Sequence, residues 1–315
     1  KVAAAIGATP DEIYFTAGGS ESDNMALRGV VNASKKEKKH IITTKIEHHA
    51  ILHTAEFLET KGVDVTYLSV DECGKISLEE LENAICPETV LISVMFANNE
   101  IGTIQPIAEI GEIAKKHGVL FHTDAVQAVG HVPIDVEKLQ VDLLSMSGHK
   151  LGASKGIGAI YIRKGTRISP LIFGGAQEKK LRAGTENIAG IVGLGKAAEL
   201  AVAEMEETTK KLTALRDKLI HGILESIPDS RLNGHPTDRL PGNCNISFSY
   251  IEGESLLLLL DALGIAASSG SACTSGSLDP SHVLMAIGLP HEIAHGSLRL
   301  TIDRENTEEQ VDFIL

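Results

Sequence analysis

Residues 107–124 read IAEIGEIAKKHGVLFHTD, a stretch that contains a helical pattern followed directly by a strand pattern. Apolar residues recur at helical spacing over 107–117, and 119–123 is a short run of extended character. Asp124 follows the end of that run. A helix that leads into a strand with a carboxylate at its end predicts one repeat of an α/β fold.

The same alternation continues on both sides of this stretch. We expect further strands at 12–16, 40–44, 63–68, 90–96 and 143–146, and further helices at 21–34, 48–60 and 78–85. Such alternation predicts βαβ units and a mainly parallel sheet of about seven strands with helices on both faces. Ligands of such sheets bind at the carboxyl ends of the strands.

The C-terminal third has a different pattern. Helical spacing runs from 188 to 225, and Pro228, Pro236 and Pro241 then interrupt it. We therefore expect a large domain at 1–206 and a small α+β domain at 207–315. The small domain should contain strands at 245–250 and 297–302 and helices at 254–263 and 281–287.

Composition excludes several classes of protein. The chain has 315 residues, of which 43% are hydrophobic, so it can bury a full core. Its 29 Lys and Arg against 42 Asp and Glu give a net charge of −13, which disfavours nucleic-acid and membrane-surface binding. The longest apolar run, 256–260, is too short to span a membrane.

The four cysteines show no spacing typical of a disulfide framework or a metal site, which favours a reducing cytoplasm and predicts no bound metal. Cys273 differs from the other three because it lies in SSGSACTSG, residues 268–276, a run with little to bury. We expect a mobile segment with an exposed thiol there, and buried inert thiols at Cys73, Cys86 and Cys244.

A lysine, a carboxylate and an amide suggest chemistry with an aldehyde cofactor. Lys150 follows a strand in SGHK, and its amine can condense with an aldehyde, helped by desolvation and by the neighbouring His149. Asp124 can keep a ring nitrogen protonated, and Gln127 can contact a ring hydroxyl. The alternatives are a surface lysine and an ordinary helix cap with its neighbour.

Two strand-to-helix junctions offer further contacts. TAGGSES, residues 16–22, can hold a phosphate through free N–H groups and the Ser20 hydroxyl, and Ser147 and His149 can add to it. Alternatively, Ser20 is only an N-cap, with Asp23 completing a capping box. His48 can stack on a planar cofactor and exchange protons, or it is a structural histidine.

Other candidate residues are ambiguous when they are taken alone. A metal site at His49 and His53 lacks a third ligand. Asn99 ends the strand that precedes Asp124. Arg299 is a charge within an apolar strand, where it can pair inside the core or grip a substrate carboxylate.

In order along the chain, these motifs resemble those of the cysteine desulfurases of the NifS/IscS type. The resemblance covers essentially the whole chain and rests on TAGGSESDN, IEHHA, ANNEIG, HTDAVQAVG, SGHK, RAGTEN and SSGSACTSGSLDPSHV. It implies a fold-type I pyridoxal-phosphate enzyme of the class V aminotransferase group. Such homodimers take sulfur from L-cysteine, release L-alanine and pass the sulfur to iron–sulfur scaffold proteins or other acceptors.

The resemblance also implies roles for individual residues. Lys150 is similar to the Schiff-base lysine and Cys273 to the nucleophile that becomes a persulfide. His48 resembles the stacking imidazole, and Asp124 and Gln127 resemble the ring partners. The phosphate contacts that it implies are Gly19, Ser20, Ser147 and His149, joined by Thr185 from the other subunit. The contacts that it implies for the substrate carboxylate are Asn99 and Arg299.

Several positions depart from the family pattern. Gly19-Ser20 replaces a more usual Ala-Thr or Cys-Thr, Ser154 stands where proline is common, and residues 177–180 differ from QERG. The family has several dozen more N-terminal residues, so we expect this chain to be a shortened form.

Other functions on the same scaffold are a selenocysteine lyase or another class V aminotransferase, and Cys273 argues against the latter. A non-catalytic docking protein is the alternative from another class. Retention of every candidate catalytic residue argues against it, and a colourless protein that still binds a scaffold would favour it.

Overall fold

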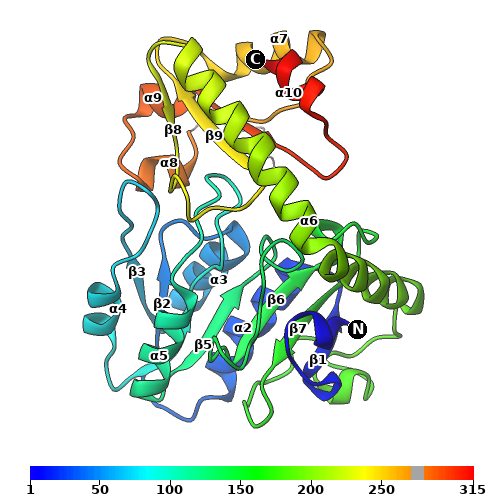
Figure 1. Cartoon of the computed structure of the whole chain (residues 1–315). Coiled ribbons are helices and arrows are strands. Elements are labelled where there is room, and N and C mark those ends of the chain that lie inside the picture. The colour runs from blue at the N-terminus through cyan, green and yellow to red at the C-terminus, as the bar shows by residue number, and fades with distance from the viewer. Residues whose placement is uncertain (271–279) are drawn as a thin grey trace. The chain divides into compact units, whose positions relative to one another are not determined.

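A computed structural model describes residues 1–270 and 280–315 (Figure 1). The chain divides into two compact units. The first comprises Lys1–Leu68, Ile76–Phe96 and Gln105–Met205, and the second comprises Ser69–Lys75, Ala97–Ile104 and Glu206–Leu315. Two short segments that precede residue 105 therefore belong with the C-terminal unit.

The first unit is built on a seven-stranded sheet of order β1-β7-β6-β5-β4-β2-β3. The pairs β2–β3, β2–β4, β4–β5 and β5–β6 are parallel, whereas β7 runs antiparallel to both β6 and β1. The strands are β1 (Ile13–Thr16), β2 (His40–Thr44), β3 (Asp64–Leu68), β4 (Thr89–Ser93), β5 (Leu120–Asp124), β6 (Leu143–Ser147) and β7 (Gly158–Ile162). The predicted α/β class with a mainly parallel sheet is confirmed, although the sequence did not indicate β7.

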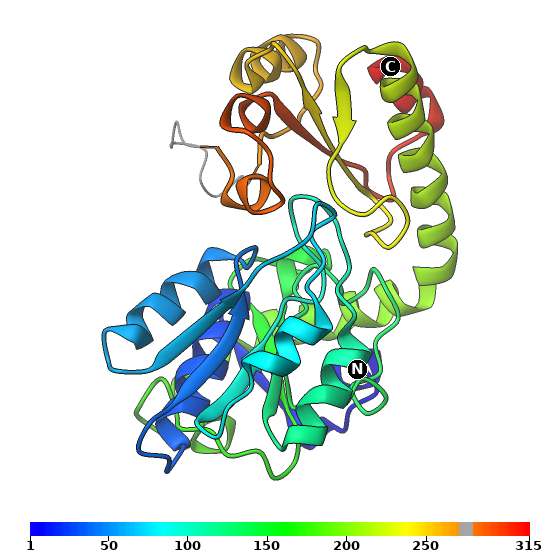
Figure 2. The same ribbon diagram turned by 90° about the vertical axis from the view of Figure 1, so that its left-hand side faces the viewer.

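Helices cover both faces of this sheet (Figure 2). Helices α2 (Gly19–Ala33) and α3 (His49–Glu59) lie on one face, where Met25, Leu27 and Ile51 pack in one core with strand residues. Helices α4 (Leu78–Ala84) and α5 (Ile107–His117) lie on the other. Gly118 ends α5 with a φ of 64°, a left-handed conformation that glycine adopts without strain.

The second unit contains an antiparallel sheet of order β10-β9-β8, formed by β8 (Ser230–Leu232), β9 (Asn243–Phe248) and β10 (Ser297–Thr301). Leu215, Leu219 and Ile223 of the long helix α6 (Ile188–Ser226) share an apolar core with it. The other helices are α7 (Gly253–Ala262), α8 (His282–Ala286), α9 (His291–His295) and α10 (Glu308–Ile314), and the short α1 (Val2–Ala5) belongs to the first unit. Within the described parts of the chain, no helix is long and apolar enough to cross a membrane.

Candidate active site

The N-terminus of α2 lies against the ends of two other strands. A Cβ atom added to Gly19 would lie 2.6 Å from Cγ2 of Val126 and 3.6 Å from Cβ of Ser147, so glycine permits this close approach. The first N–H groups of α2 therefore lie near the residues that follow β5 and end β6. Such unpaired N–H groups form an anion site.

The capping-box alternative at this helix is wrong. Helix α2 begins at Gly19 with Gly18 as its N-cap, and no side chain caps it. Ser20 is exposed in the first turn, and Asp23 is 1% exposed, so its carboxyl cannot serve an exposed helix end. The helix starts earlier than the sequence pattern predicted because two glycines precede Ser20.

Lys150 and two polar neighbours follow β6 in a 3₁₀ turn, Gly148–Lys150. Ser147 Oγ lies 2.8 Å from His149 Nδ1. The pKa of His149 is lowered, first by burial and then by the positive charges of Lys150 and Lys155. The residue Lys150 is exposed, contrary to the desolvation expected after a buried strand, and its carbonyl lies 3.2 Å from Nε2 of His131.

Asp124 is the last residue of β5 and is 6% exposed. Its Oδ1 accepts a hydrogen bond of 2.9 Å from the N–H of Val126, and burial raises the pKa of its carboxyl to about 6. Residues 126–130 form turns, with hydrogen bonds from the N–H groups of Ala128 and Val129 to the carbonyl of Ala125. Gln127 therefore lies in the turn that directly follows the end of β5.

Three further buried polar side chains lie near Asp124, and the sequence analysis assigned none of them to this site. They are Asp23 of α2, Glu47 between β2 and α3, and His122 of β5. Burial raises the pKa values of both carboxyls, to about 8 for Glu47, and the charge of Asp124 adds to both shifts. Burial lowers the pKa of His122 to about 3, so this imidazole is neutral. The only sequence signal was strand alternation, which places residues 122 and 124 on one face.

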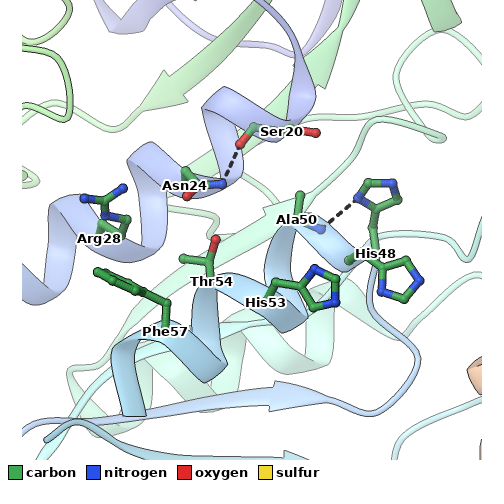
Figure 3. A pocket seen from close by; sticks show the side chains of 9 residues that line it. Ser20, Asn24, Arg28, His48, Ala50, His53, Thr54 and Phe57 are labelled. Carbon is green, nitrogen blue, oxygen red and sulfur yellow. Dashed lines mark hydrogen bonds between the residues drawn. The ribbon is translucent and has the colours of Figure 1, made fainter. Parts of the chain in front are cut away.

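His48 lies at the other side of the α2 N-terminus. It is the N-cap of α3, and its Nδ1 accepts a hydrogen bond of 3.1 Å from the N–H of Ala50. A groove of about 440 Å³ between α2 and α3 is lined by both Ser20 and His48 (Figure 3). Arg28 and Phe57 line the far end of this groove, with the guanidinium carbon 5.2 Å from the ring centroid.

Asn99 and Arg299 come together within the second unit. Nη1 of Arg299 donates to the carbonyl of Asn99 at 3.0 Å, and its Nε donates to Ser268 Oγ at 3.1 Å. The neighbouring Glu100 is 1% exposed and accepts a short hydrogen bond from Ser281. Arg299 is thus fixed by a backbone carbonyl and a hydroxyl, as a guanidinium in a polar site should be.

Two predicted residues are not joined to these groups. Thr185 lies on an exposed loop before α6, and in the described part of the chain no hydrogen bond connects it to Ser20, Ser147 or His149 of the same chain. Cys273 lies outside the described residues. Among residues 1–270 and 280–315, no group of three His, Cys, Asp or Glu side chains is placed to hold a metal ion. His49 and His53 therefore have no third ligand in this part of the chain.

The residues of the first unit fit a phosphorylated pyridine aldehyde. Asp124 has a buried carboxyl at a strand end, and among the described residues this carboxyl accepts a hydrogen bond from the backbone N–H of Val126 alone, which suits a charged ring nitrogen. The start of α2 with Ser147 and His149 suits a phosphate, and Lys150 supplies an amine on the same turn. Each of these groups comes from the carboxyl end of a strand or the turn that follows it.

Comparisons with known proteins agree over the whole chain. Residues 1–314 match the family model of aminotransferase class-V. The chain is 64% identical over 315 residues to the cysteine desulfurase IscS of Methanosarcina thermophila, covering 100% of this chain and 78% of that protein. It is 61% identical over 318 residues to the cysteine desulfurase IscS of Clostridium botulinum, covering 100% of this chain and 80% of that protein. A solved NifS-like protein superposes with a TM-score of 0.92 at 43% identity, covering 99% of this chain and 82% of that chain.

Proposed function

From the premise that this chain belongs to the class-V aminotransferase family and is a cysteine desulfurase, we propose how its residues divide the work. Enzymes of this family generally depend on pyridoxal phosphate, which supplies an electron sink for charge that develops at the substrate Cα. Lys150 is the residue that holds the cofactor covalently and moves the Cα proton. Asp124 holds the ring nitrogen in its protonated form.

The remaining first-unit residues orient the cofactor. The N–H groups of Gly19 and Ser20, the hydroxyls of Ser20 and Ser147, and His149 bind the phosphate. Gln127 contacts the ring hydroxyl, and His48 stacks on the ring. The Nδ1 of His48 accepts a hydrogen bond from the N–H of Ala50, so a neutral His48 carries its proton on Nε2, which is then a donor.

In the second unit, Arg299 and Asn99 bind the carboxylate of L-cysteine. The hydrogen bonds of the Arg299 Nη1 to the Asn99 carbonyl and of its Nε to Ser268 Oγ fix the orientation of the guanidinium fork, which suits a carboxylate. Cys273 acts as the nucleophile. Its thiolate forms an S–S bond to the substrate sulfur while the C–S bond breaks and its electron pair goes to Cβ, which is protonated as L-alanine forms.

The partners follow from this chemistry. A persulfide on Cys273 needs an acceptor thiol, which we assign to an iron–sulfur scaffold protein or another sulfur acceptor. Among the described residues Thr185 forms no hydrogen bond with Ser20, Ser147 or His149 of its own chain, and we assign it to the cofactor phosphate of a second copy in a homodimer. The spacing of the cysteines favours a reducing compartment such as the cytoplasm.

Asp124 is the observation that carries this proposal. A fully buried carboxyl at the end of a parallel strand is unfavourable when ionised unless a cation faces it, and a protonated pyridine nitrogen supplies one. The neighbouring β6 ends in the turn that carries Lys150, so amine and carboxyl come from adjacent strands. A purely structural carboxyl would not need this combination.

The test is the absorbance of the chain with pyridoxal phosphate, before and after L-cysteine, with alanine and sulfide assayed alongside. We expect a cofactor band that requires Lys150, and alanine formation that requires both Lys150 and Cys273. The Cys273→Ala variant should keep the band and lose alanine formation, whereas the control Cys86→Ala should keep both. Alanine formation that survives Cys273→Ala would contradict the assigned nucleophile, and a band that survives Lys150→Ala would contradict the assigned lysine.

A further inference from the structure

Beneath Asp124 lies a buried polar group that takes no part in the proposed chemistry. It consists of Asp23, His122 and Ser145, which come from α2, β5 and β6, with 1%, 0% and 0% of their surfaces exposed. His122 precedes Asp124 by two residues, so both side chains project from the same face of β5. Ser145 is the register partner of Asp124.

Hydroxyl groups fix His122 from both sides. Ser93 Oγ of β4 lies 2.8 Å from Nδ1, and Ser145 Oγ of β6 lies 2.9 Å from Nε2. Ser145 also acts on the carboxyl of Asp23, whose pKa it lowers against the larger effect of burial. Hydrogen bonds thus link Ser145 through His122 to Ser93, and Asp23 adjoins the Ser145 end of this chain.

The surroundings of Asp23 do not suit a negative charge. Its Oδ1 is buried and has no hydrogen-bond partner among the described residues. The nearest basic atom recorded for it, Nε2 of His122, is 3.8 Å away, which is too long for a hydrogen bond. Asp124 and Glu47 are its charged neighbours, and both are carboxyls. Burying an ionised carboxylate with no cation would be very unfavourable.

We propose that Asp23 is a positioning residue that stays a neutral carboxylic acid in the folded chain and, with Ser145 and His122, supports Asp124 as the one ionised carboxyl of this group. The role of Asp124 at the cofactor ring comes from the proposed function, whereas the neutral state of Asp23 is a property of the chain without cofactor. The Asp23 hydroxyl donates to Ser145 Oγ, Ser145 donates to Nε2 of His122, and Nδ1–H of His122 donates to Ser93 Oγ. In this order each proton of the chain has one acceptor.

The titration properties of the groups that face Asp23 agree with its neutral state. Burial, and then the charge of Asp124, raise the pKa of Asp23, and burial likewise raises the pKa of Glu47 to about 8. Burial lowers the pKa of His122 to about 3, so this imidazole is a neutral link. The pKa of Asp124 is about 6 and that of Glu47 about 8, so Asp124 ionises before Glu47 as the pH rises.

The first test measures the free energy of unfolding of the full chain without cofactor between about pH 5 and pH 8. A carboxyl whose folded pKa is raised loses stability as the pH rises above its unfolded pKa, because only the unfolded state releases the proton. The near-isosteric Asp23→Asn variant cannot release one, so its stability should fall less than that of the unchanged chain. The matched control Asp64→Asn, at an exposed aspartate that begins β3, should keep the original slope. An unchanged or steeper slope in Asp23→Asn would overturn the proposal.

Infrared spectroscopy keeps the proposal testable if Asp23→Asn does not fold. In the full-length Glu47→Gln chain near neutral pH, a band of a protonated carboxylic acid should remain, because Asp23 still carries its proton. Its absence would overturn the proposal. Neither measurement needs pyridoxal phosphate, so both outcomes are independent of whether Asp124 binds a cofactor.

A third measurement tests the support of Asp124 in the cofactor-loaded chain. Asp23→Asn should keep the pH dependence of the cofactor band, because asparagine retains the shape and neutrality of the acid. Asp23→Leu, which removes the hydrogen bond to Ser145, should shift that pH dependence and weaken cofactor binding at least several-fold. Identical behaviour of Asp23→Leu and the unchanged chain would show that Asp23 does not support Asp124.

Discussion

Two histidines of the large sheet have the same local geometry and different surroundings. His40 begins β2. Thr89 Oγ1 lies 2.8 Å from its Nδ1, and Thr66 Oγ1 lies 2.8 Å from its Nε2. His122, near the end of β5, has serine hydroxyls at 2.8 and 2.9 Å. Each imidazole is therefore held between hydroxyls of the two neighbouring strands.

The groups beyond these hydroxyls differ. Burial lowers the pKa of His40, and Asp64 and Glu88 partly oppose this effect. Burial alone acts on His122, whose nearest carboxyl is the buried Asp23. One sheet thus uses the same hydrogen-bonding device for structure at its amino end and, by our proposal, for support of the site near its carboxyl end.

The largest effect should come from the site itself. We expect Asp124→Asn to lower alanine formation by about 10²- to 10³-fold, because a neutral amide cannot stabilise a protonated ring nitrogen. Steady-state kinetics and the dissociation constant of pyridoxal phosphate measure this. Asp142→Asn, at the opposite end of the β5–β6 pair, is the control, since its carboxyl accepts from the N–H of Phe121. Equal losses in the two variants would mean that Asp124 acts only through folding.

Next in size is the loss of either histidine. His122→Ala should lower the free energy of unfolding by about 3 kcal/mol near pH 7, because it leaves a cavity and strands two buried hydroxyls. His40→Ala should lower it by about 1–2 kcal/mol, since its site is next to the surface. Urea denaturation measures both.

Acid should also separate the two histidine variants. The pKa of His122 is about 3 in the folded chain and about 6.5 in the unfolded state. As the pH falls below about 6.5, the unfolded state gains a proton that the folded state does not, so this residue favours unfolding of the unchanged chain. His122→Ala removes that contribution, so its deficit should shrink towards low pH. A deficit that grows with acid would contradict the neutral imidazole.

Glu47→Gln should have a smaller effect, with a defined sign. The folded pKa of Glu47 is about 8, so the unchanged chain loses stability as the pH rises from about 4 towards 8. The amide keeps the acceptor atom for Thr44 and Met95, which bond Oε1 at 2.9 Å each, and releases no proton. We expect the variant to gain about 2 kcal/mol relative to the unchanged chain between pH 5 and about pH 6.5. A constant difference across this range would refute the shifted pKa.

The smallest effects should come from single hydroxyls. Ser145→Ala removes a fully buried link between Asp23 and His122 and should cost about 1–2 kcal/mol. Thr66→Val removes the corresponding partner of His40 in a half-buried position and should cost less than about 1 kcal/mol. Thermal unfolding of both variants measures the difference in stability. Equal losses of stability would show that the burial of the hydroxyl does not decide how much its hydrogen bond contributes.

Local sequence predicted much of the first unit. The helix at Ile107–His117 and the strand at His40–Thr44 have the predicted bounds, because each combines a clear apolar period with a turn residue or polar end. The strand Gly158–Ile162 was not predicted, although its five residues are all buried like those of His40–Thr44. Its place between β1 and β6 depends on partners far away in the sequence.

The candidate site divides in the same way. By itself the sequence determined the elements, the strand-end positions of Asp124 and Lys150 and the resemblance to a known family, because these depend on residue type and spacing along one chain. Only the tertiary structure decided that Asp23 is a buried neighbour of Asp124 and not part of a helix cap, and that His122 lies between two hydroxyls. Burial and the charge of neighbours fix protonation states, and both are set by strands and helices that meet only in the folded chain.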